Sequence, residues 1–172
     1  MTNRIAEPVM QVGYVVEDLD AGVAHWLEHA GVGPWTVFRG VTLQGRYRDV
    51  DTTVTMDVAM GYTGALQIEL IQVTSSSPSP YATEHGDPLV GPHHVAWLTD
   101  DLEAAVTSAR ARGLEVLFSA ANPSTRVAYL HSADQPGVVF EYIQGDGLRE
   151  MVAAGIEQAR TWDGTDPIRT IG

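Results

Sequence analysis

Four side chains able to bind a metal ion occupy matching positions in two copies of an internal repeat. The five residues that begin at Gln11 align with the five that begin at His94, at an offset of 83 positions. The segment that contains Glu69 aligns with the segment that contains Glu141, at an offset of 72. One amide oxygen, one imidazole and two carboxylates form a suitable ligand set for a divalent cation such as Zn, Ni, Co, Mn or Fe(II).

Each of these residues also has an interpretation without a metal. A glutamate can face water at a sheet edge, a glutamine can bond the backbone, and a histidine can be a satisfied core residue. A polar group in an apolar strand is costly without a partner, and the paired placement of all four favours ligands. The neighbouring His93 is predicted to face away from His94 and to have a structural role, because side chains alternate along a strand.

The repeat also predicts the elements that carry these side chains. In each copy a short apolar strand is followed by an acidic residue, Asp18 or Asp101, placed to cap an amphipathic helix. The helices are expected to end near Gly31 and Gly113. Three segments with strand character follow, so each copy has the order βαβββ. Because the offset falls from 83 to 72, the first copy has about eleven extra residues, which we place between residues 35 and 64.

The chain therefore divides into two modules, a linker and a tail. We assign the first βαβββ module to residues 9–73 and the second to residues 91–144. Between them, residues 74–90 include a stretch of serine and proline that is typical of a loop. In the tail, residues 145–172, the apolar spacing across 148–162 predicts an amphipathic helix that covers a sheet face or another subunit.

In this arrangement the chain resembles the vicinal oxygen chelate superfamily, which includes glyoxalase I, methylmalonyl-CoA epimerase, extradiol dioxygenases, and fosfomycin- and bleomycin-resistance proteins. The resemblance covers residues 9–144 and is most specific at Gly-Pro-His-His-Val-Ala-Trp (91–97), at 99–102 and at 138–142. It implies an α+β fold in which two tandem βαβββ modules form a cupped, incomplete barrel around a metal. The implied ligands come from the first and last strands of each module and are Gln11, Glu69, His94 and Glu141.

The resemblance implies a metal-dependent isomerase, epimerase or lyase. The ligand set is similar to that of glyoxalase I, whereas the His-His-Val-Ala-Trp stretch is more similar to the epimerases. In such chemistry a cation polarises a carbonyl and acidifies the adjacent C–H, and a carboxylate moves the proton. Glu141 is the predicted base, with Glu69 as its partner on the opposite side. Two alternatives stay open: a non-catalytic protein that binds and sequesters a small molecule, and a ring-cleaving dioxygenase, which requires a second histidine where this chain has Gln11.

Composition excludes several other kinds of chemistry. The 172 residues contain no cysteine, and all ten basic residues are arginine, so neither a thiolate nucleophile nor a lysine Schiff base is possible. A formal net charge of −12 argues against nucleic acid as a partner, because phosphate contacts require a basic surface. The chain lacks the apolar run of about 20 residues that spans a bilayer, and residues 1–10 do not contain the apolar region that is typical of a signal peptide. We therefore expect a cytoplasmic protein without membrane contact.

The expected partner is a small-molecule substrate. Arg39, Arg46, Arg48 and Arg126 would hold an anionic cofactor tail, or they would simply be solvated. The resembled family often forms dimers, and the apolar stripe of the tail is compatible with a homodimer.

Overall fold

A computed structural model describes residues 7–171 and contains two modules with the same order of elements. The first module consists of β1 (Gln11–Val15), α1 (Leu19–Ala30), β2 (Trp35–Tyr47), β3 (Val50–Thr63) and β4 (Leu66–Val73). The second consists of β5 (Gly91–Leu98), α2 (Leu102–Ala111), β6 (Glu115–Ala121), β7 (Arg126–Ser132) and β8 (Gln135–Gln144). They are followed by α3 (Leu148–Thr161) and β9 (Ile168–Ile171). The predicted α+β class and the two βαβββ modules are confirmed.

Two pairs of equivalent side chains start the module helices. The carboxylates of Asp18 and Asp101 each accept a hydrogen bond of 2.9 Å from the backbone N–H three residues further on, as helix N-caps do. The side-chain oxygens of Gln72 and Gln144, at the ends of β4 and β8, accept bonds of 2.9 and 3.1 Å from the first backbone N–H of α1 and α2. Each helix is thus tied to the last strand of its own module, which fixes the helix against the sheet.

The eight strands of the two modules form a closed barrel. Along the sheet the order is β3-β4-β1-β5-β8-β7-β6-β2, and β2 pairs again with β3 to complete the ring. The modules meet twice, where β1 pairs with β5 and where residues 44–47 of β2 pair with residues 118–121 of β6. The expected gap in the barrel is absent because β2 is long enough to pair with β3 along one edge and with β6 along the other.

The extra residues of the first module lengthen a single hairpin. The β2–β3 hairpin spans residues 35–63, or 29 residues, and the equivalent β6–β7 hairpin spans residues 115–132, or 18, a difference of 11. Arg48 and Asp49 form its two-residue turn with φ of 47° and 64°, the left-handed geometry that matches the twist of paired strands. The insertion predicted between residues 35 and 64 is therefore confirmed, and it forms strand rather than loop.

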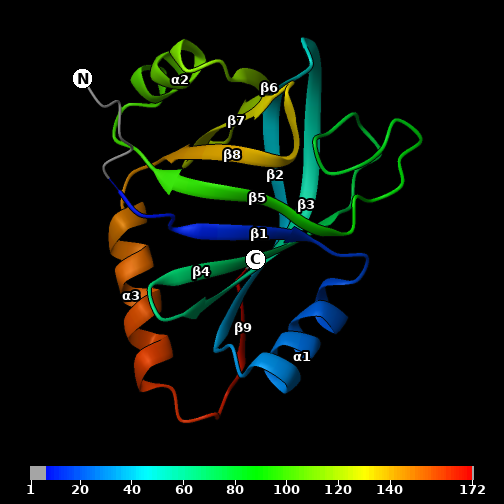
Figure 1. The fold of residues 1–172 in the computed structure, drawn as a ribbon. Helices are drawn as coiled ribbons and strands as arrows, with labels where there is room; N and C mark the ends of the chain where they lie inside the picture. The colour runs from blue at the N-terminus through cyan, green and yellow to red at the C-terminus, as the bar shows by residue number, and fades with distance from the viewer. Residues whose placement is uncertain (1–6, 172) are drawn as a thin grey trace.

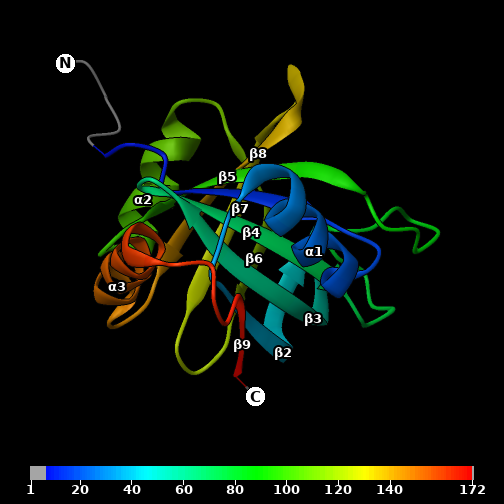
Figure 2. The same ribbon diagram turned by 90° about the horizontal axis from the view of Figure 1, so that it is seen from below.

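The helices cover the outside of the barrel. Figure 1 shows α1 and α2 at opposite corners, as a twofold relation between the modules requires, and α3 along one side. The view from below in Figure 2 places α3 and α1 on opposite sides of the barrel and β9 beside β2. Buried apolar side chains form one cluster inside the barrel, one beneath α1 and one beneath α2.

The tail contributes a helix and a strand. Helix α3 lies where the apolar spacing predicts one, and β9 pairs in parallel with residues 35–38 of β2. Strand β9 was not expected, because four residues with two apolar side chains are too short to show a period. Among residues 7–171, no helix is long and apolar enough to cross a membrane.

Candidate metal centre

The sheet brings the four predicted ligands together from four adjacent strands. Gln11 lies in β1, Glu69 in β4, His94 in β5 and Glu141 in β8, and these strands are neighbours in the order β4-β1-β5-β8. The registers are equivalent in the two modules: Glu69 pairs with Gly13, two residues after Gln11, and Glu141 pairs with Ala96, two residues after His94. All four side chains are buried. The repeat in the sequence thus becomes a shared site where the modules meet.

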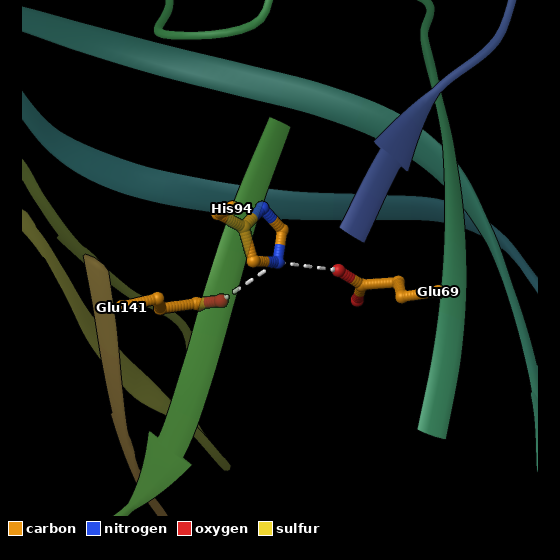
Figure 3. Close-up of side chains that lie close together, drawn as sticks. All are labelled: Glu69, His94 and Glu141. Atoms are coloured by element: carbon orange, nitrogen blue, oxygen red, sulfur yellow. Dashed lines mark ion pairs between the residues drawn. The ribbon is translucent and has the colours of Figure 1, made fainter. Parts of the chain in front are cut away.

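Three oxygen atoms converge on one nitrogen. The Nε2 atom of His94 lies 3.0 Å from Gln11 Oε1, 3.1 Å from Glu141 Oε2 and 3.3 Å from Glu69 Oε2. Figure 3 shows the two carboxylates approaching this nitrogen from opposite sides. An imidazole nitrogen has one N–H at most, so it cannot donate to all three oxygens. Atoms that share a cation at about 2.1 Å lie roughly 3 Å apart, so the spacing fits a bound divalent metal.

Glu141 has an oxygen without a hydrogen bond. Its Oε2 atom is buried beside His94 but accepts no hydrogen bond from any residue that the structure describes. Burial raises the pKa of Glu141; the charge of His94 acts in the opposite direction, and the nearby charge of Glu69 raises the pKa further. A buried carboxylate oxygen is costly unless it is paired, and a divalent cation would provide that partner.

A chain of contacts orients His94. The Nδ1 atoms of His93 and His94 lie 3.0 Å apart, and the Nε2 atom of His93 lies 2.7 Å from the carbonyl oxygen of Pro80. A carbonyl only accepts, so His93 carries its proton on Nε2 and presents a lone pair at Nδ1. Burial, then the charge of His94, lower the pKa of His93 to about 4, so His93 is neutral at pH 7. His94 must therefore carry a proton on Nδ1, which leaves its Nε2 free to bind a cation.

The expectation that His93 faces away from His94 is wrong. Strand β5 pairs with β1 through His94 opposite Gly13 and Pro92 opposite Tyr14, so His93 is the extra residue of a bulge. A bulge interrupts the alternation of side chains, and both imidazoles are buried in contact with each other. His93 is therefore beside the site, where it sets the protonation pattern of His94.

Gln11 is oriented by a second chain of side chains that was not predicted from the sequence. Its Nε2 atom donates to Gln67 Oε1 at 2.6 Å, and Gln67 Nε2 donates to the hydroxyl of Tyr62 at 2.5 Å. With its amide nitrogen engaged, Gln11 turns its oxygen toward His94. The spacing of Gln67 and Glu69 was an available signal, since residues two apart on a strand share a face.

Gly13 provides the room that the His94 ring occupies. A Cβ atom on Gly13 would lie 2.0 Å from His94 Cε1 and 2.3 Å from His94 Nε2, far inside van der Waals contact. The equivalent position in the second module is Ala96, which carries a Cβ. The first module thus accommodates the imidazole of the second through the absence of one side chain.

His94 is held as a cation when no metal replaces its proton. Burial alone would lower the pKa of His94, but the close negative charges of Glu141 and Glu69 raise it to about 10. A metal ion at this position would take the place of that proton. Together with the orphaned oxygen of Glu141, this charge balance shows that one imidazole, one amide and two carboxylates fit a divalent cation.

The site opens into a cavity of about 420 Å³ inside the barrel. Gln11, Glu69 and Glu141 are part of its lining, together with side chains from both modules and from α3. None of Arg39, Arg46, Arg48 and Arg126 lines it. Arg39 pairs with Asp20 and Asp57, Arg46 with Asp51, and Arg126 with Glu103, all as solvent-accessible ion pairs. Arg48 lies over the ring of Tyr47.

Fold and site together define a barrel of two βαβββ modules with a candidate metal centre at their contact. Residues 10–129 match the model of the Glyoxalase/Bleomycin resistance protein/Dioxygenase superfamily, and the chain belongs to this superfamily. The resemblance noted in the motifs is therefore confirmed. No curated protein matches the chain significantly.

Several solved structures share the fold. A hypothetical protein from Bacillus halodurans C-125 is 17% identical, with a TM-score of 0.53 over 81% of this chain and 94% of that one. The methylmalonyl-CoA epimerase from Mycobacterium tuberculosis is 16% identical, with a TM-score of 0.51 over 88% of this chain and 99% of that one. A variant of the Streptomyces coelicolor methylmalonyl-CoA epimerase, in complex with 2-nitronate-propionyl-CoA, is 22% identical, with a TM-score of 0.51 over 80% of this chain and 94% of that one. At these identities the likeness concerns the fold.

Proposed function

We propose that this protein is a metal-dependent isomerase, epimerase or lyase that moves a proton next to a carbonyl group. The observation that carries the proposal is the convergence of Gln11, Glu69 and Glu141 on the Nε2 atom of His94, at the inner end of a cavity large enough for a small molecule. A buried metal ligand set beside an accessible cavity is the arrangement that metal-assisted proton transfer needs.

Each residue of the centre has a separate task. Gln11, Glu69, His94 and Glu141 would hold the cation, which supplies polarisation of a substrate carbonyl and stabilises negative charge on its oxygen. Glu141 accepts the proton from the carbon next to that carbonyl; the C–H bond breaks and its electron pair moves toward the carbonyl carbon. A carboxylate has two oxygens, so Glu141 can accept a proton on one while the other remains at the centre. The raised pKa of Glu141 brings this group closer to the pH at which a general base works well.

Glu69 is placed to complete the reaction. It lies on the side of His94 opposite Glu141 (Figure 3) and also lines the cavity. Delivery of a proton by Glu69 to the other face of the same carbon would invert its configuration, which is an epimerisation. In an α-hydroxy carbonyl compound, delivery of the proton by Glu141 to the former carbonyl carbon, with transfer of the hydroxyl proton to the former carbonyl oxygen, would move the carbonyl group to the neighbouring carbon, which is an isomerisation. The choice between the two depends on how the substrate lies between the carboxylates.

A second candidate function is storage or sequestration of a small molecule without catalysis. The cavity favours it, because an apolar chamber of about 420 Å³ can bind a ligand whether or not a metal is present. A ring-cleaving dioxygenase is less well supported, since the cluster of ligands among the described residues has one histidine where that chemistry uses two.

Metal analysis distinguishes these functions. The protein is purified without an affinity tag or chelator, and its metal content is measured by elemental mass spectrometry, before and after addition of Zn, Ni, Co, Mn or Fe(II). We expect about one divalent ion per chain in the native protein and in His25→Ala, which changes an exposed histidine of α1, and loss of the ion in His94→Ala. A native protein that contains no metal and takes up none would contradict the proposal and favour the binding protein.

A further inference from the structure

The walls of the cavity are mostly apolar, and the polar side chains of Asn122, Ser124 and Thr125 line it at half-buried or exposed positions. Four of the five methionines of the chain, Met10, Met56, Met60 and Met151, line it, accompanied by aliphatic side chains of both modules. Methionine is flexible and polarisable, and it adapts to ligands of irregular shape. Such walls match a substrate body made of hydrocarbon.

The buried amides and hydroxyls that line the cavity are already engaged in hydrogen bonds with other side chains. The hydroxyls of Tyr81 and Tyr129 lie 2.6 Å apart and form a hydrogen bond, and Gln67 is bonded to Tyr62 and Gln11. Only the metal centre offers a buried oxygen that lacks a hydrogen-bond partner among the described residues. A ligand can therefore satisfy polar atoms at the metal centre, while the rest of its buried surface meets mainly apolar side chains.

Charge around the cavity has one sign. Its charged lining residues among the described part of the chain are Glu69, Glu141 and Asp146, and none is basic. Arg126 and Arg149 neighbour lining residues in sequence, but their guanidinium groups are paired with Glu103 and with Asp100 and Glu7. Away from the metal centre, an anionic group inside this cavity would meet no basic side chain and would face the exposed carboxylate of Asp146.

We infer that the substrate is an uncharged, largely apolar carbonyl compound that has its oxygen atoms at one end, and that phosphate-bearing or other anionic conjugates are excluded. The inference rests on the proposed function for the oxygen-bearing end of the substrate. The apolar remainder of the substrate occupies the space between the long β2–β3 hairpin and the first turns of α3. A coenzyme A thioester does not fit this description, because its phosphates are anionic and no basic side chain lines the cavity.

A matched set of ligands tests the inference. Binding of phenacyl alcohol, its para-butyl derivative, its para-sulfonate and methylmalonyl-CoA is measured by isothermal titration calorimetry on the metal-loaded protein and on the metal-free protein. All four contain a carbonyl group, and they differ in the size, polarity and charge of the rest of the molecule. We expect the butyl compound to bind more tightly than the parent, and the sulfonate and the thioester to bind about tenfold or more weakly than the butyl compound.

Two variants that introduce an arginine test whether the ligand binds in the cavity. Met151→Arg adds a cation at an exposed lining position of α3 and should tighten binding of the sulfonate. Gln158→Arg adds the same charge at an exposed position of the helix that does not line the cavity, and it should leave that affinity unchanged. An unchanged affinity in Met151→Arg, or an equal gain in both variants, would overturn the placement.

Tight binding of the sulfonate or the thioester to the native protein would overturn the inference about substrate class. Metal content of the same samples reports on the proposed function separately. A protein that takes up no metal yet still prefers the butyl compound would contradict the metal-dependent reaction and leave the apolar ligand class intact. A protein that binds metal but prefers the anionic compounds would contradict the apolar ligand class and leave the metal-dependent reaction intact.

Discussion

The two modules share a fold but contribute different chemistry to the centre. The second module supplies the imidazole of His94 and the most buried carboxylate, Glu141, whereas the first supplies an amide oxygen from Gln11 and the more exposed carboxylate of Glu69. The first ligand of each module is held differently: His93, supported by Pro80 of the linker, orients His94, while Gln67 and Tyr62 of the first module orient Gln11. The nitrogen ligand and the predicted base are thus concentrated in one half of a nearly symmetric site.

The modules also differ in what they give to the cavity. The β2–β3 hairpin of the first module is 11 residues longer than its counterpart and supplies much of the apolar wall. A duplicated scaffold has therefore divided its tasks, because one copy anchors the centre and the other shapes the space for a ligand. The following predictions concern substitutions in one module. Where the other module has an equivalent residue, its substitution serves as the comparison.

The largest effect is expected from the carboxylates. Glu141→Gln should lower the rate of proton exchange by about 10²- to 10⁴-fold, the contribution of a general base, while metal content is retained because an amide oxygen still binds a cation. Exchange of the α-protons of phenacyl alcohol with deuterated solvent, followed by NMR, measures the rate. Glu69→Gln is the matched variant in the first module. Similar rates in the native protein and Glu141→Gln would remove Glu141 from the role of base.

The next largest effect is expected at Gly13. Gly13→Ala places a Cβ inside the His94 ring and should lower the free energy of unfolding by about 1–3 kcal/mol, the cost of overpacking a core, and displace His94 from its ligand position. Urea unfolding of the metal-free protein measures the loss, and metal content reports the displacement. Ala96→Gly, the matched substitution in the second module, removes a Cβ instead of adding one and should leave the metal content unchanged. Normal metal binding by Gly13→Ala would show that the ring can move without losing its function.

A smaller effect is expected at His93. His93→Leu removes the acceptor for the Nδ1 proton of His94 and should weaken zinc binding by about 10- to 100-fold, as loss of a group that supports a metal ligand does. His93→Gln keeps an acceptor oxygen and should recover part of the affinity. Competition with a zinc-sensitive dye measures both. If the glutamine variant bound zinc as weakly as the leucine variant, His93 would act by packing alone.

The mildest effect is a dependence on pH. Although burial opposes it, Glu141 and Glu69 raise the pKa of His94 to about 10, so below that value a cation must displace one proton and its apparent affinity should rise about tenfold per pH unit. Zinc titrations between pH 6 and 8 measure the slope. A slope near zero would mean that His94 is already neutral.

The same raised pKa predicts how stability changes without metal. The folded-state pKa of His94 lies above the ordinary value of 6.5, so the stabilisation from its ion pairs is fully present below 6.5 and is lost as pH rises toward 10. In His94→Ala this part of the pH dependence should disappear from urea unfolding curves.

The sequence was sufficient for the modules and for the four central residues. Both predictions rested on the internal repeat. A duplicated strand-helix-strand pattern constrains the fold, and polar residues repeated at equivalent positions of apolar strands indicate a shared site. Glu69, His94 and Glu141 lie close together because the two modules are related by a twofold axis. Their roles as ligand and base remain predictions.

Other features depended on information that no single segment contains. The bulge that turns His93 toward His94 arises from the pairing of β5 with β1, and closure of the barrel arises from the pairing of β2 with β6. Gln67 and Tyr62 become partners of Gln11 only through the register of β4 and β1 and the hairpin that β3 forms with β4. Such contacts join residues far apart in the chain, and local periodicity does not report them.

Strand β2 has a consequence for folding during synthesis. One edge pairs with β3, which follows at once, but the other edge waits for residues 118–121 of β6 and then for residues 168–171 of β9. At ribosomal speeds the last of these emerges on the order of ten seconds after β2. Until then the first module presents an unpaired strand edge, which makes the nascent chain prone to aggregation and a candidate client for chaperones.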